Sequence, residues 1–340
     1  MSDRLPILGI DIGGTKLAVC LAEPDGTIRS EAWEPSRAAE GPDVMIRRVI
    51  EMARRVIREA ELDIEQVVAI GIGCGGPLDP DRGIIINALN NPGWVDVPLV
   101  ERVQRALGRP AYLDNDANAA TLAERRFGAG RGIRNMVYLT ISTGVGGGVI
   151  LDGRLRHGEN GNAGELGHIS VCYQGRRCHC GGIGCLEAYV SGTSIAARAR
   201  EALRAGAHSP ELAHLAAAGE ERVTGEAVVE AVRHGDPLAR ALWDETMEML
   251  GTGVASMINA FNPRRIVLGG GVTRAGDLLF EPVRRIALQR AIPALAEVVE
   301  ITPAALGDRA GILGAVAVAL ERLERGDARQ ESIDRLTDDG

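Results

Sequence analysis

The chain has 340 residues, which is enough for one large domain or two domains with an ample core. Its content of 45% hydrophobic and 25% charged residues is typical of a soluble globular protein. The formal net charge of -8 argues against nucleic acid as the main partner, because phosphate backbones are normally bound by a basic face.

Neither a secretory signal nor a membrane span is expected. The N-terminus leads within a few residues into a short strand-like run, Leu5–Ile10, instead of a charged region followed by a long apolar one. The longest apolar runs, Val67–Gly76 and Gly311–Leu320, have about ten residues and are too short to cross a bilayer. We therefore expect no membrane partner and a cytoplasmic location, where a reducing environment suits free thiols.

Predicted strands and helices alternate along the chain, which indicates α/β layers. Short apolar runs predict strands at Ile7–Ile10, Leu17–Leu21, Val67–Ile72, Ala111–Leu113, Met136–Ile141, Val149–Leu151, Arg265–Leu268 and Val298–Ile301. Helices are predicted at Asp43–Ala60, Ala117–Phe127, Glu187–Ala205, Pro237–Ala260, Leu278–Arg290 and Arg309–Arg325. A polar, alanine-rich linker is expected at 206–225, and a disordered tail at 326–340, which has almost no large apolar residues.

Glycine-rich turns predict a phosphate site. Such turns leave backbone N–H groups free to surround an anion, and the chain has three, at Gly13-Gly14, Gly144–Gly148 and Gly269–Gly271. A single one would be explained equally well as a tight hairpin. The first two lie in hairpins about 130 residues apart, which suggests a duplicated unit whose halves grip a nucleotide in a cleft.

The first turn also carries charged residues suited to a metal nucleotide. Asp11 would bind a hydrated Mg²⁺, which prefers one or two carboxylates plus phosphate oxygens. Lys16 is the sole lysine among 38 basic residues, and a compact ammonium near phosphate would explain its presence, although chance would too. Thr15 and Thr143 are the hydroxyl residues of the first two turns.

Two nucleotide-binding signatures are rejected. The run Gly71-Ile-Gly-Cys-Gly-Gly76 matches the dinucleotide fingerprint, but Pro77 and the turn after it stand where a helix should begin. A Walker A sequence is also ruled out, because Lys16 follows threonine instead of glycine.

A cluster of one histidine and three cysteines predicts a structural zinc site. His168, Cys178, Cys180 and Cys185 fall within eighteen residues and would fill all four positions of a tetrahedral metal. A redox pair or a disulfide is the alternative, but Cys-x-Cys is too tight for an easy bridge. With no open position for a water, the metal would fix the loop that carries two flanking carboxylates. These are Glu165 and Glu187.

A catalytic base is expected in Asp114-Asn115-Asp116-Ala-Asn118, where a predicted strand runs into a helix. One of these residues would serve as the helix N-cap. A single cap does not need three such residues, and a carboxylate at a strand end is well placed to accept a proton from a substrate hydroxyl in phosphoryl transfer.

These motifs together resemble those of the ROK family (repressors, ORFs and sugar kinases), in order from about residue 7 to residue 322. The matching segments are Asp11-Ile-Gly-Gly-Thr-Lys16, Asn115-Asp-Ala-Asn-Ala119, Ser142-Thr-Gly-Val-Gly-Gly-Gly148, Gly164-Glu-Leu-Gly-His168 and Cys178-His-Cys-Gly-Gly-Ile-Gly-Cys-Leu-Glu187.

The resemblance implies a duplicated, two-domain actin-like ATPase (ribonuclease H-like) fold and ATP-dependent phosphorylation of a hexose. It places a smaller domain at 1–120 plus 310–325, and a larger one at 121–309 with the zinc loop at 165–187. It also implies a homodimer or homotetramer.

The same resemblance assigns site residues. It makes Asp116 the catalytic base and has the zinc bound by His168, Cys178, Cys180 and Cys185. Sugar contacts are implied for Gly76, Asn91, Asn115, Asp116, Glu165, His168 and Glu187. Contacts to ATP and its Mg²⁺ are implied for Asp11, Gly13, Gly14, Thr15, Lys16, Thr143, Gly144, Gly146, Gly269 and Gly270.

The substrate expected is glucose, phosphorylated at its 6-hydroxyl. Asn91-Pro-Gly-Trp94 is similar to the Asn-Leu-Gly-Trp segment of glucokinases in this family, with Pro92 in place of the leucine. Asn91 is the expected sugar contact, and Trp94 is expected in the core. Alternatives are an N-acetylmannosamine or N-acetylglucosamine kinase, a non-catalytic sugar sensor, and a repressor, for which the ten residues before Asp11 leave no room for a winged helix.

Overall fold

The chain forms two compact units, each with its own sheet and core. The computed structural model describes residues 5–88 and 91–338. Unit 1 comprises Met1–Gly132, His157–Ala163 and Leu306–Gly340, and unit 2 comprises Ile133–Arg156 and Gly164–Ala305. The chain therefore passes between the units at four places.

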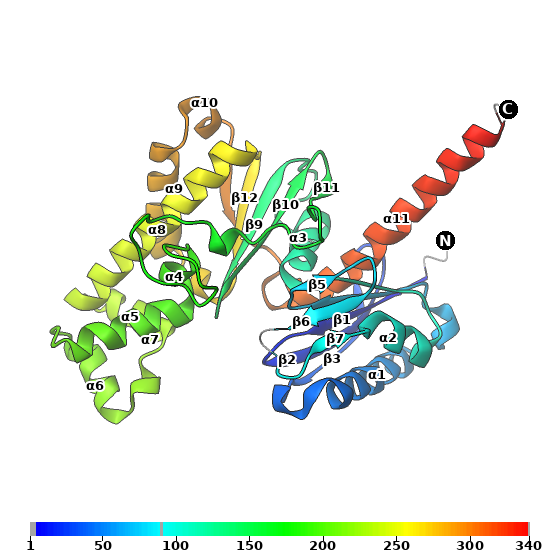
Figure 1. The fold of residues 1–340 in the computed structure, drawn as a ribbon, viewed down its shortest axis with the longest axis horizontal. Helices are drawn as coiled ribbons and strands as arrows, with labels where there is room; N and C mark the ends of the chain where they lie inside the picture. The colour runs from blue at the N-terminus through cyan, green and yellow to red at the C-terminus, as the bar shows by residue number, and fades with distance from the viewer. Residues whose placement is uncertain (1–4, 89–90, 339–340) are drawn as a thin grey trace. The chain divides into compact units, whose positions relative to one another are not determined.

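Unit 1 is built on a five-stranded sheet with the order β3-β2-β1-β4-β8 and a smaller sheet with the order β5-β6-β7 (Figure 1). The strands are β1 (Ile7–Ile12), β2 (Lys16–Ala22), β3 (Ile28–Pro35), β4 (Ile70–Cys74), β5 (Leu78–Asp79), β6 (Ile84–Asn87), β7 (Val95–Val97) and β8 (Ala111–Asn115). The helices are α1 (Gly41–Glu59), α2 (Leu99–Leu107), α3 (Asp116–Phe127) and α11 (Ala310–Asp338).

Unit 2 is built on a five-stranded sheet with the order β11-β10-β9-β12-β13. Its strands are β9 (Met136–Ile141), β10 (Val145–Leu151), β11 (Arg154–Leu155), β12 (Arg265–Gly269) and β13 (Glu300–Pro303). Its helices are α4 (Glu187–Val190), α5 (Gly192–Arg204), α6 (Pro210–Ala218), α7 (Gly225–Arg233), α8 (Pro237–Phe261), α9 (Asp277–Arg290) and α10 (Pro293–Ala296).

The two large sheets have the same topology. In unit 1, β1 pairs antiparallel with β2 and parallel with β4, and β4 pairs parallel with β8. In unit 2, β9 pairs antiparallel with β10 and parallel with β12, and β12 pairs parallel with β13. The predicted duplication is therefore confirmed, and in each unit a glycine-rich turn joins the central strand to its antiparallel neighbour.

Close packing of α11 explains two of the glycines in the strands of unit 1. A Cβ on Gly71 of β4 would lie 1.7 Å from the carbonyl oxygen of Ala315, and one on Gly9 of β1 would lie 2.6 Å from that of Ile312. Gly71 of the run at 71–76 therefore serves helix packing, and the strand continues into the turn before β5. The rejection of the dinucleotide fingerprint is confirmed.

Several predicted elements differ from the structure. The helix expected at 187–205 is interrupted at Ser191, whose extended backbone and hydroxyl cap the start of α5 by accepting from the N–H of Ser194. The linker expected at 206–225 contains α6, which begins after a Ser209 cap and continues with Pro210 at its first position. Helix α2 and strand β3 were not predicted.

The predicted domain limits also shift. Residue 120 falls inside α3, so unit 1 continues to Gly132, and it regains the chain at His157–Ala163 and again from Leu306. The stretch expected as a disordered tail is helical to Asp338, as the C-terminal part of α11. Its alanine, arginine, glutamate and leucine residues are good helix formers, which a reading based on the lack of apolar residues overlooks.

Within the described residues, no helix is both long enough and apolar enough to cross a membrane.

Candidate active site

The first glycine turn lies between β1 and β2 and is closed by its own backbone. The N–H of Gly13 donates to the carbonyl of Lys16 at 3.0 Å, and the hydroxyl of Ser36 donates to the carbonyl of Gly14. A Cβ on Gly13 would come within 3.1 Å of the Lys16 carbonyl oxygen. Glycine is therefore the residue that fits this tight turn at the end of β1.

Asp11 and Asp116 lie near one another, at the ends of β1 and β8. The backbone of Gly73 in β4 runs beside both: a Cβ there would lie 3.9 Å from an Asp11 carboxylate oxygen and 4.0 Å from the Cα of Asp116. Desolvation by burial raises the pKa of Asp11 to about 7; the charge of Asp116 also raises it, and Lys16 lowers it. A cation bound at Asp11 would relieve this cost.

The helix cap at the start of α3 is Asn115, and Asp116 is the first residue of the helix. The Asn115 side chain accepts from the N–H groups of Ala117 and Asn118 at 2.9 and 3.4 Å. The Asp116 carboxylate is accessible to solvent, and one of its oxygens accepts from the N–H of Ala117. Desolvation by the surrounding protein raises the pKa of Asp116, although the Ala117 N–H opposes this shift. A raised pKa favours a carboxylate that takes up a proton.

A loop that the sequence analysis missed lies beside the predicted sugar residues of unit 1. A Cβ on Gly76 would meet the Asn115 amide nitrogen at 3.3 Å and the Asn162 side-chain oxygen at 3.7 Å. The same Asn162 oxygen accepts from the N–H of Leu78 at 3.2 Å. The available signal was the loop composition around Asn162, His-Gly-Glu-Asn-Gly-Asn-Ala, in which glycine and asparagine alternate as in many binding loops.

Asn91 and Trp94 are both buried, and each has a side-chain polar atom without a hydrogen-bond partner among the described residues. Asn91 is 2% exposed and Trp94 is fully buried in the core of unit 1, as predicted for the latter. The Asn91 side-chain oxygen and the Trp94 indole nitrogen find no hydrogen-bond partner among the described residues. An acceptor in this state is suited to a ligand hydroxyl.

The second glycine turn lies between β9 and β10, and other elements hold it. The N–H of Gly192 donates to the carbonyl of Ser142 at 2.7 Å, and the Thr193 hydroxyl donates to the carbonyl of Thr143 at 2.6 Å. The third turn is adjacent: Gly270 has φ +89°, and a Cβ there would lie 2.4 Å from the Ile141 carbonyl oxygen.

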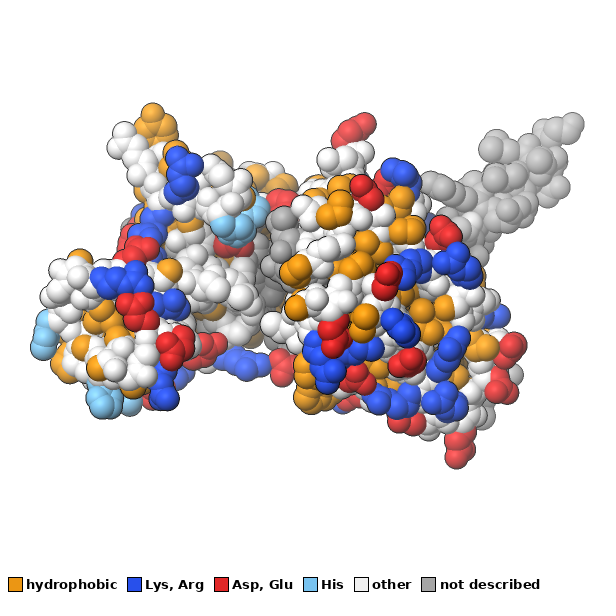
Figure 2. Space-filling view, turned by 60° about the horizontal axis from the view of Figure 1, so that its bottom comes forward, with side chains coloured by type: hydrophobic (Ala, Val, Ile, Leu, Met, Phe, Trp, Pro, Cys, Tyr) orange, Lys and Arg blue, Asp and Glu red, His pale blue; other side chains and the backbone are white. Residues whose placement is uncertain are grey.

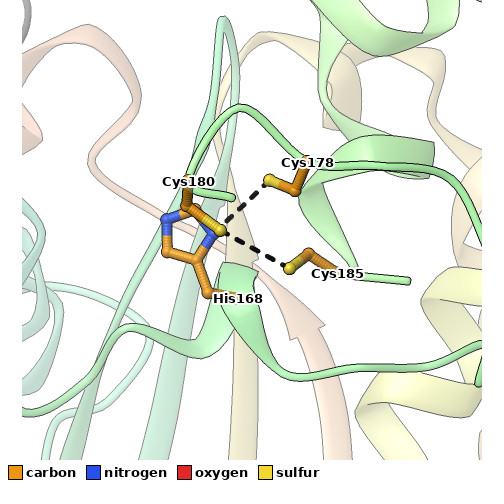
Figure 3. Close-up of side chains that lie close together, drawn as sticks. All are labelled: His168, Cys178, Cys180 and Cys185. Atoms are coloured by element: carbon orange, nitrogen blue, oxygen red, sulfur yellow. Dashed lines mark hydrogen bonds between the residues drawn. The ribbon is translucent and has the colours of Figure 1, made fainter. Parts of the chain in front are cut away.

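The predicted metal ligands come together in unit 2 (Figure 3). The Sγ atoms of Cys180 and Cys185 are 3.7 Å apart, and the His168 Nδ1 lies 3.8 Å from the Cys178 Sγ. A tetrahedral zinc with bonds of about 2.3 Å to sulfur requires ligand separations of about 3.8 Å. All six cysteines are free thiols, so the alternative of a disulfide is not what the structure shows.

The thiols of the cluster are in different environments. The N–H of Gly182 donates to the Cys180 sulfur at 3.4 Å and lowers its pKa. Burial raises the pKa of Cys178, and it raises that of Cys185 to about 12. Burial thus disfavours the thiolate forms of Cys178 and Cys185. A metal cation bound between the three sulfurs would stabilise these thiolates, because metals bind the deprotonated ligands.

Glu187 connects the cluster to the second glycine turn. One carboxylate oxygen accepts from the buried N–H of Val145 at 2.7 Å, and a Cβ on Gly144 would lie 2.7 Å from the same oxygen. The other oxygen lies 3.9 Å from the Cys178 Sγ and 4.0 Å from the His168 Nδ1. The loop that carries the cysteines and the second turn are thus in contact through Glu187.

Glu165 lies on the other side of the imidazole. Its carboxylate is 3.8 Å from the His168 Nε2, and its side chain is 60% exposed, compared with 8% for Glu187. The two glutamates are therefore close to one histidine, and of the two only Glu165 is open to solvent. A second potential ligand group, His168, His179 and Glu187, shares His168 with the cluster and was not predicted.

The comparison with known proteins gives one family. A ROK family model matches residues 7–322. The chain is 36% identical over 320 residues to the glucokinase of Thermotoga maritima, covering 94% of this chain and 99% of the relative. It is also 30% identical to the xylose repressor of Caldicellulosiruptor bescii, over 92% of this chain and 78% of that one.

Solved structures agree. The ROK hexokinase from Thermus thermophilus matches with a TM-score of 0.79 and 36% identity, covering 94% of this chain and 99% of that one. A ROK family glucokinase from Streptomyces griseus, in complex with glucose and AMPPNP, matches with a TM-score of 0.78 and 32% identity, over 93% and 99% of the two chains. The likeness confirms the predicted actin-like ATPase fold, and with the match over residues 7–322 it leads to one conclusion: the chain belongs to the ROK family.

Proposed function

We propose that this protein is an ATP-dependent glucokinase that transfers the γ-phosphoryl group of ATP to the 6-hydroxyl of glucose. The observation that carries the proposal is the match, over nearly the whole chain, to a glucokinase structure that holds glucose and an ATP analogue. The position of Asp116 next to Asn115, whose side chain lies near Gly76, supports it, because a proton acceptor then lies among polar groups suited to a sugar.

Asp116 is the proposed base. As the sugar oxygen forms its bond to the γ-phosphorus and the bond from that phosphorus to the bridging oxygen of ADP breaks, the hydroxyl proton passes to the Asp116 carboxylate. The raised pKa of Asp116 suits this transfer, since a carboxylate that is costly to keep charged accepts a proton readily.

The glycine turns are the proposed phosphate site. Backbone N–H groups at Gly13, Gly14, Thr15, Gly144, Gly146, Gly269 and Gly270 would contact the phosphates, with Lys16 and Thr143 contributing their side chains. Asp11 would hold Mg²⁺ through water, which neutralises phosphate charge in such reactions.

Zinc is the proposed occupant of the His168, Cys178, Cys180 and Cys185 cluster. A zinc with four protein ligands supplies rigidity to the loop and leaves no position for an activated water. His168 would bind the metal through Nδ1, on the side of the cysteines, while Nε2, on the side of Glu165, would remain for a sugar hydroxyl.

Seven residues are proposed to contact the sugar. Asn91, Gly76, Asn115 and Asp116 would contribute from unit 1, and the unpartnered oxygen of Asn91 would accept a hydroxyl proton. Glu165, His168 and Glu187 would contribute from unit 2. Only one oxygen of Glu187 would be available, because the other holds the N–H of Val145.

Two other functions have specific support. An N-acetylmannosamine kinase is favoured by a solved relative described as putative for that activity, and a regulator is favoured by the xylose repressor match. On the face drawn in Figure 2, basic side chains lie among acidic ones. The expected absence of a nucleic-acid partner, the homodimer or homotetramer and the cytoplasmic location stay predictions.

A substrate panel tests the proposal. Glucose, fructose, allose, N-acetylglucosamine and N-acetylmannosamine are each incubated with MgATP, and ADP release is followed in a coupled assay. Glucose should give the highest kcat/KM, and the Asp116→Asn variant should serve as the blank. Turnover only with an acetylated sugar would reassign the substrate, and binding of a sugar without turnover would favour the sensor.

A further inference from the structure

Two buried carboxylates lie in one short segment and are not used by the proposed reaction. The segment is β8 with α3, Ala111–Phe127, and is called here the β8–α3 segment. Asp114 is 2% exposed and Glu124 is fully buried. A buried carboxylate is costly unless hydrogen bonds compensate it, so its partners indicate what it does.

Glu124 accepts hydrogen bonds from the backbone near two of the four places where the chain passes between the units. One oxygen accepts from the N–H of Ala129 at 2.8 Å, just before the passage at Gly132. The other accepts from the N–H of Leu306 at 2.9 Å, the first residue after the last passage. The fit is tight: a Cβ on Gly128 would lie 2.1 Å from the Glu124 carboxylate.

Asp114 contacts the backbone segment at a third such place through the side chain of His157. Its carboxylate lies 2.6 Å from the Nε2 of His157, the residue at which the chain re-enters unit 1. Its other oxygen accepts from the Asn118 side chain at 3.0 Å. The excursion is closed on itself, since the N–H of Ala163 donates to the carbonyl of His157 at 2.9 Å.

Both carboxylates lie on the same short segment as Asp116. Asp114 is two residues before it, and Glu124 is eight residues after it on the same helix, about 12 Å along the axis. The helix is stiffly supported, because a Cβ on Gly314 of α11 would lie 2.6 Å from the backbone of Ala119. A displacement of the connecting chain would therefore be passed to the start of α3.

We propose that Asp114 and Glu124 are positioning residues that couple the connections between the two units to the placement of Asp116. The proposal rests on the proposed function for the role of Asp116 as base. In two-domain enzymes, closure on substrate is absorbed at a few connecting residues. Here the unit 1 ends of three connections are fastened to the segment that carries the base.

The test uses the full-length, zinc-loaded protein and needs no ligand for its first measurement. Glu124→Gln replaces one acceptor by a donor that faces a backbone N–H, without changing the size of the side chain. Hydrogen exchange followed by mass spectrometry should become faster around residues 128–133 and 304–308, and also at the start of α3, residues 115–118. A purely local role would leave the exchange at 115–118 as in the wild type, and that result would overturn the proposal.

Steady-state kinetics provide the second measurement. For Glu124→Gln we expect kcat to fall about tenfold while the affinities for glucose and ATP change by less than about twofold. His157→Phe, which removes the partner of Asp114 at a half-buried site, should act in the same direction, and His157→Gln, which keeps a donor, should restore much of the loss. His157→Phe decides the matter if Glu124→Gln does not fold.

Glu31→Gln is the matched control. It breaks an exposed ion pair with Arg309, close to the same last passage, and should change neither exchange nor kcat. Wild-type kcat in both Glu124→Gln and His157→Phe would also overturn the proposal. If the wild type phosphorylates no sugar, the proposed function fails, while the exchange measurement still tests the coupling.

Discussion

The two glycine turns at the centre of the two sheets occupy equivalent positions, but they are held by different means. The fifth residue of β1 is Asp11, whereas the fifth residue of β9 is Thr140. The first turn thus has a carboxylate of its own. The second turn contacts the carboxylate of Glu187, at the start of α4, which follows the loop that carries the cysteines.

This difference shows how a duplicated topology acquires two functions. Strand order fixes where both turns lie, but long-range contacts decide what controls them. The first turn depends on β1, β2 and Ser36. The second depends on Glu187, which follows the loop that carries the cysteines, so its shape should depend on that loop.

The largest expected effect lies in unit 1. Asp116→Asn should lower kcat by about a thousandfold with little change in the affinity for glucose or ATP, because only the proton acceptor is lost. Steady-state kinetics with binding calorimetry measure this. Asp63→Asn, at an exposed helix cap that asparagine also serves, is the control and should keep the wild-type kcat. Near-normal turnover of Asp116→Asn would remove Asp116 from its assigned role.

The next effect concerns the metal loop of unit 2. Cys180→Ser should lower the zinc content below the one ion per chain expected for the wild type, and it should weaken both sugar and ATP binding by about tenfold or more. ATP binding should weaken as well, because Glu187 at the end of this loop accepts a hydrogen bond from Val145 of the second turn. Elemental analysis and calorimetry measure the two quantities. Zinc-free wild type with three freely titrating thiols would contradict the metal assignment.

The carboxylate of the first turn should show itself in the pH dependence of stability. Burial raises the pKa of Asp11 to about 7 from its ordinary value of 3.8, so between these pH values the folded protein binds more protons than the unfolded chain. The Asp11 contribution to the free energy of unfolding therefore falls as the pH rises from about 4 to about 7.

Asp11→Asn should remove this contribution. At pH 8 the variant should be more stable than the wild type by about 2 kcal/mol, less than the full shift would give because the side chain remains partly accessible. Near pH 3 the two should be alike. Denaturant unfolding across this range measures the difference, and equal pH profiles would show that Asp11 ionises freely.

The smallest expected effect tests the geometry of the second turn. Gly144→Ala would place a methyl group 2.7 Å from a Glu187 oxygen and should displace that carboxylate from the N–H of Val145. We expect ATP affinity to fall by about threefold to tenfold with zinc retained. Gly326→Ala, at a position with open space in α11, is the control. An unchanged ATP affinity would mean that the contact between Glu187 and Val145 contributes little to ATP binding.

Much of this molecule could be predicted from local sequence signals. The two glycine hairpins, the strands around them and the four metal ligands lie in compact motifs, and the structure brings each set together. Short elements were harder. Helix α6 and strand β3 are partly exposed and carry weak apolar periodicity, so their place depends on tertiary contacts.

The contacts between distant segments could not be predicted. Nothing local indicates that Asn162 reaches the backbone near Gly76, that His157 pairs with Asp114, or that Glu187 meets the N–H of Val145. These pairs are separated by 42 to 84 residues, and only the fold brings them together.

The most direct test of the link between the metal loop and the nucleotide turn is calorimetric ATP binding to a Glu187→Ala variant whose zinc content is measured in parallel. The four metal ligands remain in this variant, while the carboxylate that holds the N–H of Val145 is removed. We expect about one zinc per chain together with an ATP affinity lowered by about tenfold. Retained zinc with wild-type ATP affinity and a loss of sugar binding alone would contradict it.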